Sequence, residues 1–566
     1  MKVVIIGGVA GGASCAARIR RLDEKAQILI FERSGYISYA NCGLPYYIGG
    51  VITDRKALTL QTPESFWSRF RIQVKTRHEV TSIDTANKTV TVKDLNTNTS
   101  FTESYDRLVI ATGAKPTVPA MAGTDLDNVF TVRTVEDTLR LRQYIEEKST
   151  KSVVIAGGGF VGIEMAENLR DLGANVTIVQ KDSQLLTPLD PDMATFVHAK
   201  MRSRSVNLKF NSTVMGFESD GDQIKTLLAG ESPLVSDIVI LAIGVTPDTK
   251  LAKDAGLKLG IRDSIVVNDL MQTSAPDIYA VGDAVQVKHY VTGEDALISL
   301  AGPANKQGRI AANNICGKGD RFPDSQGSSV LKLFDLTIAS TGINEKTAKA
   351  AGIEVEKVVL PVSSHATYYP DAQNLVVKVI CSKKTQKVLG AQITGYDTVD
   401  KRIDVLATAI HCGMTGPELA ELDLAYAPPY ASAKDLVNMA GFVLENLFNG
   451  LVKQFHYDEV PNLPTDGSVF LVDVRTPAEY EAGHADGFVN IPLDDVRDRM
   501  AEIPADRPVY VMCRGGTRSY IACRILEQNG YDCYNFSGGY SFYSAVSQEI
   551  AFTKESFPCC IEQPKA

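Results

Sequence analysis

Cys513 stands in a sequence that suits chemistry at sulfur. The apolar run at residues 508–512 predicts a strand that delivers the cysteine into a short loop, Cys-Arg-Gly-Gly-Thr-Arg, and the residues from Ser519 onward predict a helix. Backbone N–H groups of such a loop can point inward and, with the helix N-terminus and Arg518, stabilise a negative charge on the sulfur. The pattern therefore predicts a catalytic thiolate or persulfide at Cys513, assisted by Arg518.

Two glycine-rich turns predict binding sites for dinucleotides. Each turn follows a β-branched apolar run and precedes a helical pattern. The first, at residues 7–12, reads Gly-Gly-Val-Ala-Gly-Gly and has valine at the middle glycine of GxGxxG. The second is a full match, with glycines at 157, 159 and 162. In such turns the backbone N–H groups and the helix N-terminus face a pyrophosphate.

The residue at the end of the next strand bears on the ribose of each nucleotide. Glu32 lies 20 residues after Gly12, where a carboxylate accepts hydrogen bonds from a ribose. The corresponding residue of the second unit is Gln180, followed by Lys181. A carboxylate would favour the 2′-hydroxyl of NAD, and an arginine would favour the 2′-phosphate of NADP. The neutral Gln180 therefore discriminates poorly between the two nucleotides. We expect NAD(P)H, with NADH favoured.

These motifs need several folded units to position them. The succession of strand, glycine turn and helix occurs at residues 2–22 and again at 152–180, which implies two nucleotide-binding domains. From about residue 330 the pattern changes to mixed strands and helices. Residues 453–468 are polar and rich in turn formers, as in a linker, and a further unit begins at Val469 and ends near residue 550.

Composition excludes several classes of protein. The 566 residues carry 58 Lys and Arg against 67 Asp and Glu, a formal net charge of −9, which argues against a nucleic-acid or anionic-membrane binder. No segment approaches the roughly 20 apolar residues that span a bilayer. Ten cysteines are too few for a disulfide scaffold. The N-terminal apolar segment is interrupted by glycines and arginines, which argues against a secretory signal. We expect a cytoplasmic protein with no nucleic-acid or membrane partner.

Two further motifs carry a family resemblance. The segments YDRLVIATGAKP (105–116) and TSAPDIYAVGDA (273–284) resemble the second and third flavin motifs of the two-dinucleotide disulfide reductases, which are FAD-dependent pyridine-nucleotide oxidoreductases. With the glycine turns they cover residues 1 to about 450 in the family's order. The resemblance implies that Asp283 binds the FAD ribitol and Glu32 the adenine ribose. It implies cofactor contacts at Gly7, Gly8, Ala10, Gly11, Gly12, Glu32, Arg33, Val80, Ala111, Thr112, Gly113, Gly157, Gly159, Phe160, Val161, Gly162, Gln180, Gly244, Gly282, Asp283 and Ala301.

Cys42 is the second candidate for sulfur chemistry. Family members that reduce cystine-like substrates carry two cysteines four residues apart beside the flavin, and here Ser38 stands at the first position. A lone thiol beside a flavin must cycle through a disulfide with an external thiol, a persulfide or a sulfenic acid. The segment SYANCGLPYYIGG (38–50) resembles coenzyme A-disulfide reductases and, more loosely, single-cysteine NADH oxidases and peroxidases.

Two tyrosine motifs strengthen the first of these resemblances. HATYYP (365–370) and YAPPY (426–430) resemble motifs of the coenzyme A-disulfide reductases. The resemblance implies a homodimer in which Tyr368 and Tyr426 reach Cys42 from the partner subunit. A phenol, with a pKa near 10, can protonate a departing thiolate. The alternative is that these tyrosines only pack in a core or an interface.

A set of basic and polar residues suits coenzyme A, which carries a 3′-phosphate and a pyrophosphate. In a helix over residues 13–22, Ser14, Arg18 and Arg21 share one face. The resemblance implies substrate contacts at Ser14, Arg18, Arg21, Ser38, Asn41, Arg71, Asn305 and Lys434. Arginines late in a helix can also merely complement the helix dipole, and this alternative stays open.

The C-terminal part resembles a rhodanese domain, on residues 471–493 and the Cys513 loop. That loop has six residues from Cys513 to Arg518, whereas related phosphatases have one more, so we expect sulfur transfer rather than phosphate ester hydrolysis. Cys523 and Cys533 are expected to be packing residues. The pair at 559 and 560 could relay sulfur or be a simple tail.

The sequence thus predicts an α/β protein with two Rossmann-like dinucleotide-binding domains, an α+β dimerisation domain and a C-terminal α/β rhodanese domain. The predicted boundaries are 1–113 and 250–325 for FAD, 114–249 for NAD(P)H, 326–450 for dimerisation, 451–466 for the linker, 467–551 for rhodanese and 552–566 for the tail. The chain resembles coenzyme A-disulfide reductase/rhodanese fusions of the NADH-dependent persulfide reductase type.

That resemblance implies FAD-dependent reduction of CoA persulfide, polysulfide or CoA disulfide by NAD(P)H, releasing sulfide and CoA, with no metal. Small-molecule thiols and persulfides are the expected substrates. One alternative is a single-cysteine NADH peroxidase or oxidase, which would need a histidine near the flavin. None of the seven histidines lies beside the first glycine turn, although His365 keeps that alternative open. The other alternative is a non-catalytic redox-sensing sulfur carrier.

Overall fold

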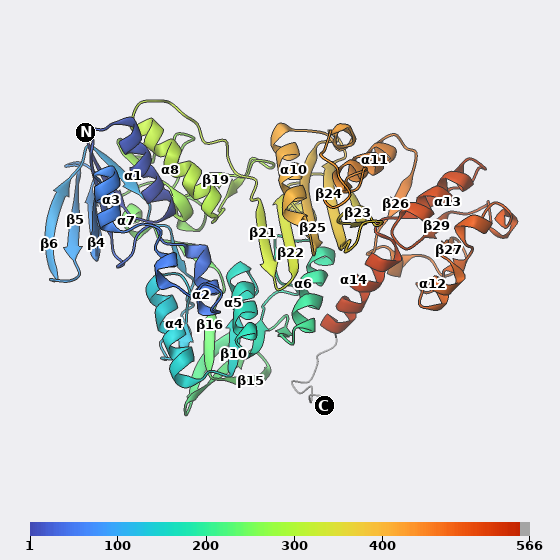
Figure 1. The fold of residues 1–566 in the computed structure, drawn as a ribbon, viewed down its shortest axis with the longest axis horizontal. Helices are drawn as coiled ribbons and strands as arrows, with labels where there is room; N and C mark the ends of the chain where they lie inside the picture. The colour runs from blue at the N-terminus through green and yellow to red at the C-terminus, as the bar shows by residue number, and fades with distance from the viewer. Residues whose placement is uncertain (555–566) are drawn as a thin grey trace. The chain divides into compact units, whose positions relative to one another are not determined.

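The computed structural model describes residues 1–554 and divides into two compact units (Figure 1). The first unit contains Met1–Asp182 and Arg204–Gly327, and the second contains Ser183–Ser203 and the chain from Ser328 onward. The cysteines at 559 and 560 lie outside the described residues. The mixed α/β fold class that the sequence predicts is confirmed by the sheets described next.

The first glycine turn belongs to a five-stranded parallel sheet with the strand order β18-β7-β1-β2-β3. These strands are Ile278–Ala280 (β18), Arg107–Ile110 (β7), Lys2–Ile6 (β1), Gln27–Glu32 (β2) and Gln73–Thr76 (β3). The apolar residues of β1 are buried because elements cover both faces of a parallel sheet. Two helices that follow the sheet motifs, α1 (Ala10–Leu22) and α8 (Ala301–Ile315), pack against each other.

The second glycine turn belongs to another parallel sheet, in the order β12-β11-β10-β16-β9. Its strands are Asn207–Lys209 (β12), Asn175–Val179 (β11), Ser152–Ala156 (β10), Ile238–Leu241 (β16) and Val129–Phe130 (β9). Its helices include α4 (Val135–Lys148) and α5 (Phe160–Asp171). The predicted repetition of the strand, turn and helix unit is therefore confirmed.

Shorter elements complete the first unit. Two antiparallel sheets consist of β4 (His78–Asp84), β5 (Thr89–Asp94) and β6 (Thr99–Ser104), and of β13 (Val214–Asp220), β14 (Gln223–Leu228) and β15 (Glu231–Ser236). The remaining strands pair as β8 (Ala114–Pro116) with β17 (Val245–Pro247) and β19 (Val287–Lys288) with β20 (Asp295–Ala296). The remaining α-helices are α2 (Leu44–Ile48), α3 (Pro63–Phe70) and α7 (Lys250–Asp254).

The second unit contains an antiparallel sheet in the order β21-β22-β25-β24-β23. Its strands are Ser329–Leu333 (β21), Leu336–Gly342 (β22), Val388–Gly395 (β25), Asn374–Ser382 (β24) and Val355–Ser363 (β23). Of its helices, α10 (Val399–Cys412) packs on β22 and β25, and α11 (Leu436–Phe448) packs on β23. The other two helices beside this sheet are α6 (Pro191–Ser203) and α9 (Glu345–Ala350).

The C-terminal part of this unit is a parallel sheet in the order β26-β30-β29-β27-β28. Its strands are Lys453–Phe455 (β26), Cys533–Phe536 (β30), Val509–Met512 (β29), Phe470–Asp473 (β27) and Val489–Asn490 (β28). Its helices are α12 (Pro477–Glu481), α13 (Thr517–Glu527) and α14 (Gly539–Lys554). The strand and the helix that the sequence predicts around Cys513 are β29 and α13, although α13 begins two residues earlier than expected.

The segment that contains α6 groups with the second unit, although the predicted boundaries include it in residues 114–249. Its Asp190 and Asp192 contact the ammonium of Lys378 at 3.0 and 2.8 Å, and Glu345 is a third carboxylate partner of that ammonium. Lys378 is fully buried in β24. A buried ammonium needs compensating charge, so these ion pairs hold α6 against the antiparallel sheet.

In the part of the chain that the structure describes, no helix combines the length and apolar character needed to cross a membrane.

Candidate active site

Glycine is required by close packing in the first turn. Gly7 has φ +100°, and a Cβ there would lie 2.3 Å from the carbonyl oxygen of Ala111. A Cβ on Gly12 would lie 2.0 Å from the oxygen of Gly7. Real Cβ atoms do not approach other atoms this closely, so the sequence keeps glycine where strand, turn and helix meet. This packing brings the start of α1 to the carboxyl end of the sheet.

The N-terminus of α1 is open to an anion. The helix has no side-chain cap and no acidic residue in its first turn, so its first N–H groups can bind a phosphate. The buried carboxylate of Glu32 accepts hydrogen bonds from the backbone N–H groups of Gly8 and Ser34, both at 2.9 Å. Glu32 is thereby fixed beside the turn, as a ribose acceptor must be. These features fit the FAD that the resemblance implies.

Asp283 lies three residues after the end of β18 and forms an ion pair with Arg133, with Nη2 2.8 Å from Oδ2. Thr112 and Arg33 both contact Asp248: the Thr112 hydroxyl donates to its carbonyl oxygen at 2.6 Å, and the Arg33 guanidinium lies 2.9 Å from its carboxylate. The structure therefore gathers the flavin-motif residues from separate loops at the ends of parallel strands.

Other predicted cofactor residues occupy varied positions. The side chain of Val80 is buried in the hydrophobic core of the first unit, so a contact to a nucleotide would have to come from its backbone. Gly113, Gly244 and Gly282 adopt positive φ angles, and Ala301 is the first residue of α8. The contacts of these residues with a cofactor stay predictions.

The second glycine turn is built in the same way as the first. A Cβ on Gly157 would lie 2.3 Å from the oxygen of Ala242, and one on Gly162 would lie 2.1 Å from the oxygen of Gly157. Helix α5 starts at Phe160 and Val161 with no side-chain cap and no acidic residue in its first turn. The turn thus fits a second pyrophosphate.

Gln180 occupies the place that Glu32 occupies in the first unit. Its Oε1 accepts a hydrogen bond from the N–H of Gly158 at 2.8 Å, as Glu32 accepts one from Gly8. Its Nε2 donates to the carboxylate of Asp182 at 3.2 Å. An amide therefore replaces the carboxylate at the ribose position, with an acidic side chain beside it.

Cys42 lies in a short 3₁₀ helix (Asn41–Gly43) immediately before α2. It is exposed and, like all eight cysteines among residues 1–554, it is a free thiol. Partial burial of the Cys42 thiol raises its pKa, and the carboxylates of Glu164 and Asp283 raise it further. The guanidinium of Arg133 lowers it. Among the described residues, this sulfur forms no disulfide.

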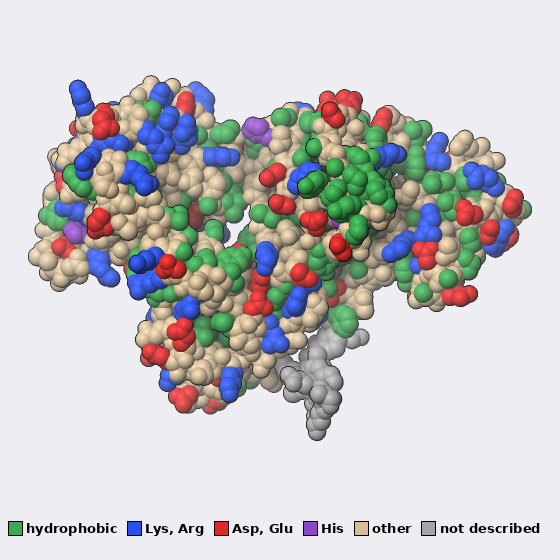
Figure 2. All heavy atoms as spheres, in the orientation of Figure 1, with side chains coloured by type: hydrophobic (Ala, Val, Ile, Leu, Met, Phe, Trp, Pro, Cys, Tyr) green, Lys and Arg blue, Asp and Glu red, His purple; other side chains and the backbone are tan. Residues whose placement is uncertain are grey.

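The candidate coenzyme A residues of the first unit come from neighbouring helices. Ser14 of α1 donates a hydrogen bond to Asn305 of α8 at 2.5 Å, and Arg18 donates to Asn313 at 2.7 Å. Arg21 is exposed on the same helix. Figure 2 shows Lys and Arg side chains gathered over α1 and α8. An exposed basic face of this kind can bind phosphate groups.

The other predicted substrate residues of this unit lie in loops. Ser38 and Asn41 belong to the loop that carries Cys42, and the N–H of Ser38 donates to the oxygen of Gly8 at 2.8 Å. Arg71 ends α3 in a left-handed conformation, with its guanidinium 5.5 Å from the centre of the Trp67 ring. Lys434 belongs to the second unit.

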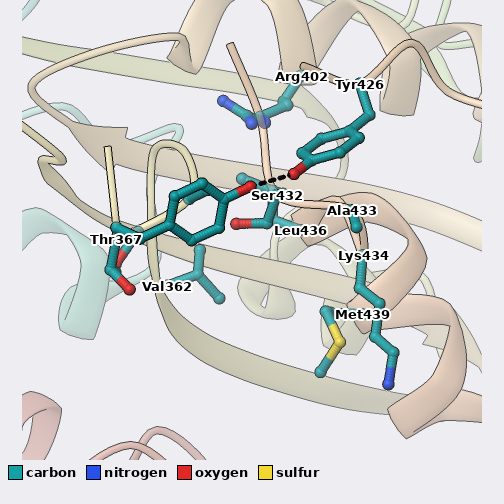
Figure 3. A pocket seen from close by; sticks show the side chains of 12 residues that line it. Val362, Thr367, Arg402, Tyr426, Ser432, Ala433, Lys434, Leu436 and Met439 are labelled. Carbon is teal, nitrogen blue, oxygen red and sulfur yellow. Dashed lines mark hydrogen bonds between the residues drawn. The ribbon is translucent and has the colours of Figure 1, made fainter. Parts of the chain in front are cut away.

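The two predicted tyrosines meet in the second unit. The hydroxyls of Tyr368 and Tyr426 share a hydrogen bond of 2.5 Å, drawn as a dashed line in Figure 3. This bond raises the pKa of Tyr426. Both rings are exposed, Tyr368 at 74% and Tyr426 at 45%, and Figure 2 shows hydrophobic side chains gathered on this part of the molecule. An exposed aromatic surface suits a contact with a partner subunit.

The tyrosines line a cavity of about 390 Å³. Lys434, Ser432 and Arg402 also line it (Figure 3). The buried Arg402 forms an ion pair with Asp435 at 3.0 Å and donates to the oxygen of Ser364 at 2.8 Å. Arg402 therefore fixes both loops that carry the tyrosines, a role that no sequence motif predicts.

His365 is fully engaged in that framework. One ring nitrogen is hydrogen-bonded to the hydroxyl of Ser364 at 2.9 Å and the other lies 3.0 Å from the oxygen of Pro370. The side chain is buried. These contacts give His365 a structural role in the tyrosine loop.

Cys513 lies at the end of β29, where the loop cradles its sulfur. The N–H of Gly516 donates to Sγ at 3.1 Å, and the hydroxyl of Ser519 donates at 3.2 Å. Such donors stabilise a thiolate or a persulfide. Arg518 contacts Glu479 instead, in a two-bond ion pair of 2.7 and 2.8 Å. The expected assistance of Arg518 to the sulfur stays a prediction.

Cys523 and Cys533 are buried together in the hydrophobic core beneath this loop. The pKa of Cys523 is raised well above its usual value by a hydrogen bond with Cys533 and by burial. Buried thiols of this kind are inert, which agrees with the packing role expected for them.

The Cys513 loop lies beside the antiparallel sheet of its own unit. A Cβ on Gly515 would lie 3.9 Å from the oxygen of Pro361 in β23. The same strand donates a buried hydrogen bond from the N–H of Val359 to the hydroxyl of Ser537, at 3.0 Å. Val362 and Ser363, which follow Pro361, line the tyrosine cavity. The cavity and the Cys513 loop therefore adjoin the same strand.

Comparison with known families divides the chain into three parts. Residues 1–308 match the pyridine nucleotide-disulphide oxidoreductase family, residues 328–437 match the dimerisation domain of pyridine nucleotide-disulphide oxidoreductases, and residues 456–545 match the rhodanese-like domain.

Individual proteins are similar over most of the chain. A coenzyme A disulfide reductase of Staphylococcus aureus is 36% identical over 442 residues, which are 78% of this chain and 99% of that protein. The crystal structure of reduced Bacillus anthracis CoADR-RHD has a TM-score of 0.94 and 46% identity and covers 97% of this chain and 98% of that one. A NAD-dependent persulfide reductase from A. fulgidus has a TM-score of 0.90 and 36% identity over 96% of this chain and 100% of that one.

Proposed function

We propose, from the premise that this chain belongs to the pyridine nucleotide-disulphide oxidoreductase family, that it reduces persulfides and disulfides of coenzyme A through Cys42. The chain is an oxidoreductase of that family with a dimerisation domain and a rhodanese domain. One observation carries the proposal: Cys42 is an exposed free thiol in a loop that has Ser38 where a second cysteine would stand. Its disulfide partner must therefore come from outside.

The reaction balances with Cys42 as the nucleophile. Its thiolate attacks the CoA-side sulfur of CoA persulfide, the S–S bond breaks, and the terminal sulfur leaves as hydrosulfide. The mixed disulfide between Cys42 and CoA then takes up two electrons and one proton, which restores the thiolate and releases the CoA thiol. Bound FAD supplies these electrons from NAD(P)H.

Tyr368 and Tyr426 are proposed to supply the proton. Because the two hydroxyls share a hydrogen bond, one phenol donates to the other, and the O–H of the acceptor remains available for a departing sulfur. In the proposed homodimer they act on Cys42 of the partner subunit. The basic face of α1 and α8 would bind the phosphates of CoA, through Arg18 and Arg21.

The rhodanese domain favours persulfide over plain disulfide as the substrate, since simple disulfide recycling has no use for a sulfur carrier. Cys513 would carry sulfane sulfur to or from CoA or another small thiol. The position of Gly515 beside β23, which also borders the tyrosine cavity, supports exchange of sulfur between the two sites within one assembly. Such proximity raises the local concentration of a shared intermediate.

NADH is the proposed reductant. The carboxylate of Asp182 lies beside Gln180 at the ribose position and would repel the 2′-phosphate of NADPH. We also propose the domain boundaries predicted from the sequence, with Ser183–Ser203 assigned to the second unit, and a cytoplasmic location because the described cysteines are all free thiols.

The test is anaerobic NADH oxidation with CoA persulfide, polysulfide, CoA disulfide and hydrogen peroxide, with sulfide measured in parallel. Cys42→Ser should abolish NADH-driven sulfide release. Cys513→Ser should spare that release and remove sulfurtransferase activity. Cys412→Ser, which removes another exposed cysteine, serves as the matched control and should change neither.

Three results would contradict the proposal. Sulfide release retained by Cys42→Ser would remove its basis. NADH consumption with peroxide as fast as with CoA persulfide would favour a peroxidase, and tight FAD binding without bleaching of the flavin by NADH would favour a redox-sensing sulfur carrier.

A further inference from the structure

Arg133 lies directly before α4, and its backbone is fixed by the start of that helix. The carboxylate of Asp137 accepts hydrogen bonds from the N–H groups of Arg133 and Thr134, at 3.2 and 3.0 Å. Thr134 in turn caps the helix by accepting from the N–H of Asp137 at 3.1 Å. A capping box of this kind holds the chain entering the helix in one conformation. The side chain of Arg133 therefore starts from a rigid position.

The guanidinium of Arg133 contacts the flavin-motif aspartate. Its Nη2 lies 2.8 Å from Oδ2 of Asp283, and the two side chains are only 23% and 15% exposed. The same nitrogen would lie 3.6 Å from a Cβ on Gly113, so the guanidinium also lies beside this residue of the second flavin motif. An ion pair with this much burial is screened less by solvent than one on the surface.

Arg133 also holds the loop that carries Cys42. With the Asn41 amide oriented to satisfy both groups, its nitrogen donates to the carbonyl oxygen of Arg133 at 3.0 Å and its oxygen accepts from Nη1 at 3.2 Å. The hydroxyl of Tyr39 donates to the same carbonyl oxygen at 3.4 Å. Arg133 thus binds the Cys42 loop through both its backbone carbonyl and its guanidinium, and the same guanidinium binds Asp283.

Two carboxylates and one guanidinium act on the Cys42 thiol. Glu164 of α5 and Asp283 both disfavour a thiolate at this position, and Arg133 is the cation that opposes them. A thiolate is the reactive form of cysteine. Loss of the Arg133 charge would leave Cys42 facing two carboxylates and a partly desolvated site.

We propose that Arg133 is a positioning residue that fastens the Cys42 loop to the flavin-motif aspartate and provides the positive charge that the Cys42 thiolate needs. The inference rests on the proposed function, in which Cys42 is the redox thiol. It extends that function because it assigns stabilisation of the Cys42 thiolate to a residue just before the N-terminus of α4.

The test measures the pH dependence of Cys42 alkylation in the FAD-loaded protein without substrate, by mass spectrometry of the Cys42 peptide. A nearby opposite charge shifts a pKa by about one unit or more, so Arg133→Gln should slow alkylation of Cys42 at pH 7 about tenfold. Arg133→Lys keeps the charge and should recover most of the rate. Arg140→Gln removes a charge from α4 whose side chain contacts Asp127 and Phe130, and should have no effect.

An unchanged alkylation profile in Arg133→Gln would overturn the proposal. Should that variant fail to bind FAD, Arg133→Lys decides: a tenfold loss despite the retained charge would overturn the electrostatic role. Because alkylation requires no turnover, these outcomes are separate from the Cys42→Ser test of sulfide release, which bears on the proposed function alone.

Discussion

Two glycine variants in the second turn would separate nucleotide binding from folding. A Cβ on Gly162 would lie 2.1 Å from the oxygen of Gly157, whereas ordinary contact starts near 3.4 Å. Turn and helix would have to separate by about 1.3 Å, and such overpacking costs about 1–3 kcal/mol. Gly159 has φ −82° and ψ −174°, which alanine adopts freely, and its Cβ would meet no atom of the described residues within 4 Å.

Gly162→Ala should therefore lower stability, whereas Gly159→Ala should weaken nucleotide binding at unchanged stability. Gly162→Ala should lower the Tm by several degrees, at about 2–4 °C per kcal/mol for a domain of this size. Gly159→Ala should leave the Tm unchanged, since its methyl group enters open space at the N-terminus of α5. That space is where a pyrophosphate would lie, so Gly159→Ala should raise the Kd for NADH at least about tenfold, or 1.4 kcal/mol.

Calorimetry and NADH titration of the FAD-loaded protein measure both quantities. FAD content should stay at the parent level because the variants alter only the second turn. If Gly159→Ala binds NADH as tightly as the parent, or loses as much stability as Gly162→Ala, the pyrophosphate does not lie at this turn as expected.

Three further predictions follow from charges and hydrogen bonds. Glu164→Gln should lower the pKa of Cys42; because burial raises the pKa of Glu164 to about 7, the change in alkylation rate should be seen above pH 7 and disappear below it. Lys378→Met should destabilise the second unit by about 3–5 kcal/mol in urea unfolding because it leaves three carboxylates without their ammonium. In the parent, the pKa of Glu345 is depressed from 4.5 to about 2. The ionised carboxylate of Glu345 therefore stabilises the fold above pH 4.5, and this stabilisation should be lost as the pH falls from 4.5 to about 2. Tyr426→Phe should slow turnover with CoA persulfide about tenfold or more with unchanged FAD content, and equal rates would exclude proton transfer by the tyrosine pair.

The sequence predicted well those features that local patterns encode. The glycine turns at residues 7–12 and 157–162 were recognisable because tight packing admits no side chain there, and the structure has the expected strand and helix on either side. The Cys513 loop was recognisable for a similar reason, since a strand, two glycines and a helix N-terminus follow one another directly. In each case the chemistry depends on neighbours in the chain.

Contacts between distant residues could not be read in this way. Arg133 and Asp283 are 150 positions apart, and no spacing links them. Glu479, which pairs with Arg518, lies 39 positions before it on another element. The grouping of Ser183–Ser203 with the second unit depends on a lysine of β24 that reads in the sequence as one charge in an apolar strand. These arrangements are set by tertiary packing, which a single sequence does not reveal.

In the proposed reaction, the covalent partner of Cys42 is an external thiol. This assignment is tested most directly by treating the oxidised, FAD-loaded protein with CoA persulfide in the absence of NADH and identifying the modification of the Cys42 peptide by mass spectrometry. We expect a mixed disulfide between Cys42 and CoA that disappears when NADH is added. A Cys42 that remains unmodified while sulfide is released, or that carries only a sulfenic acid, would contradict it.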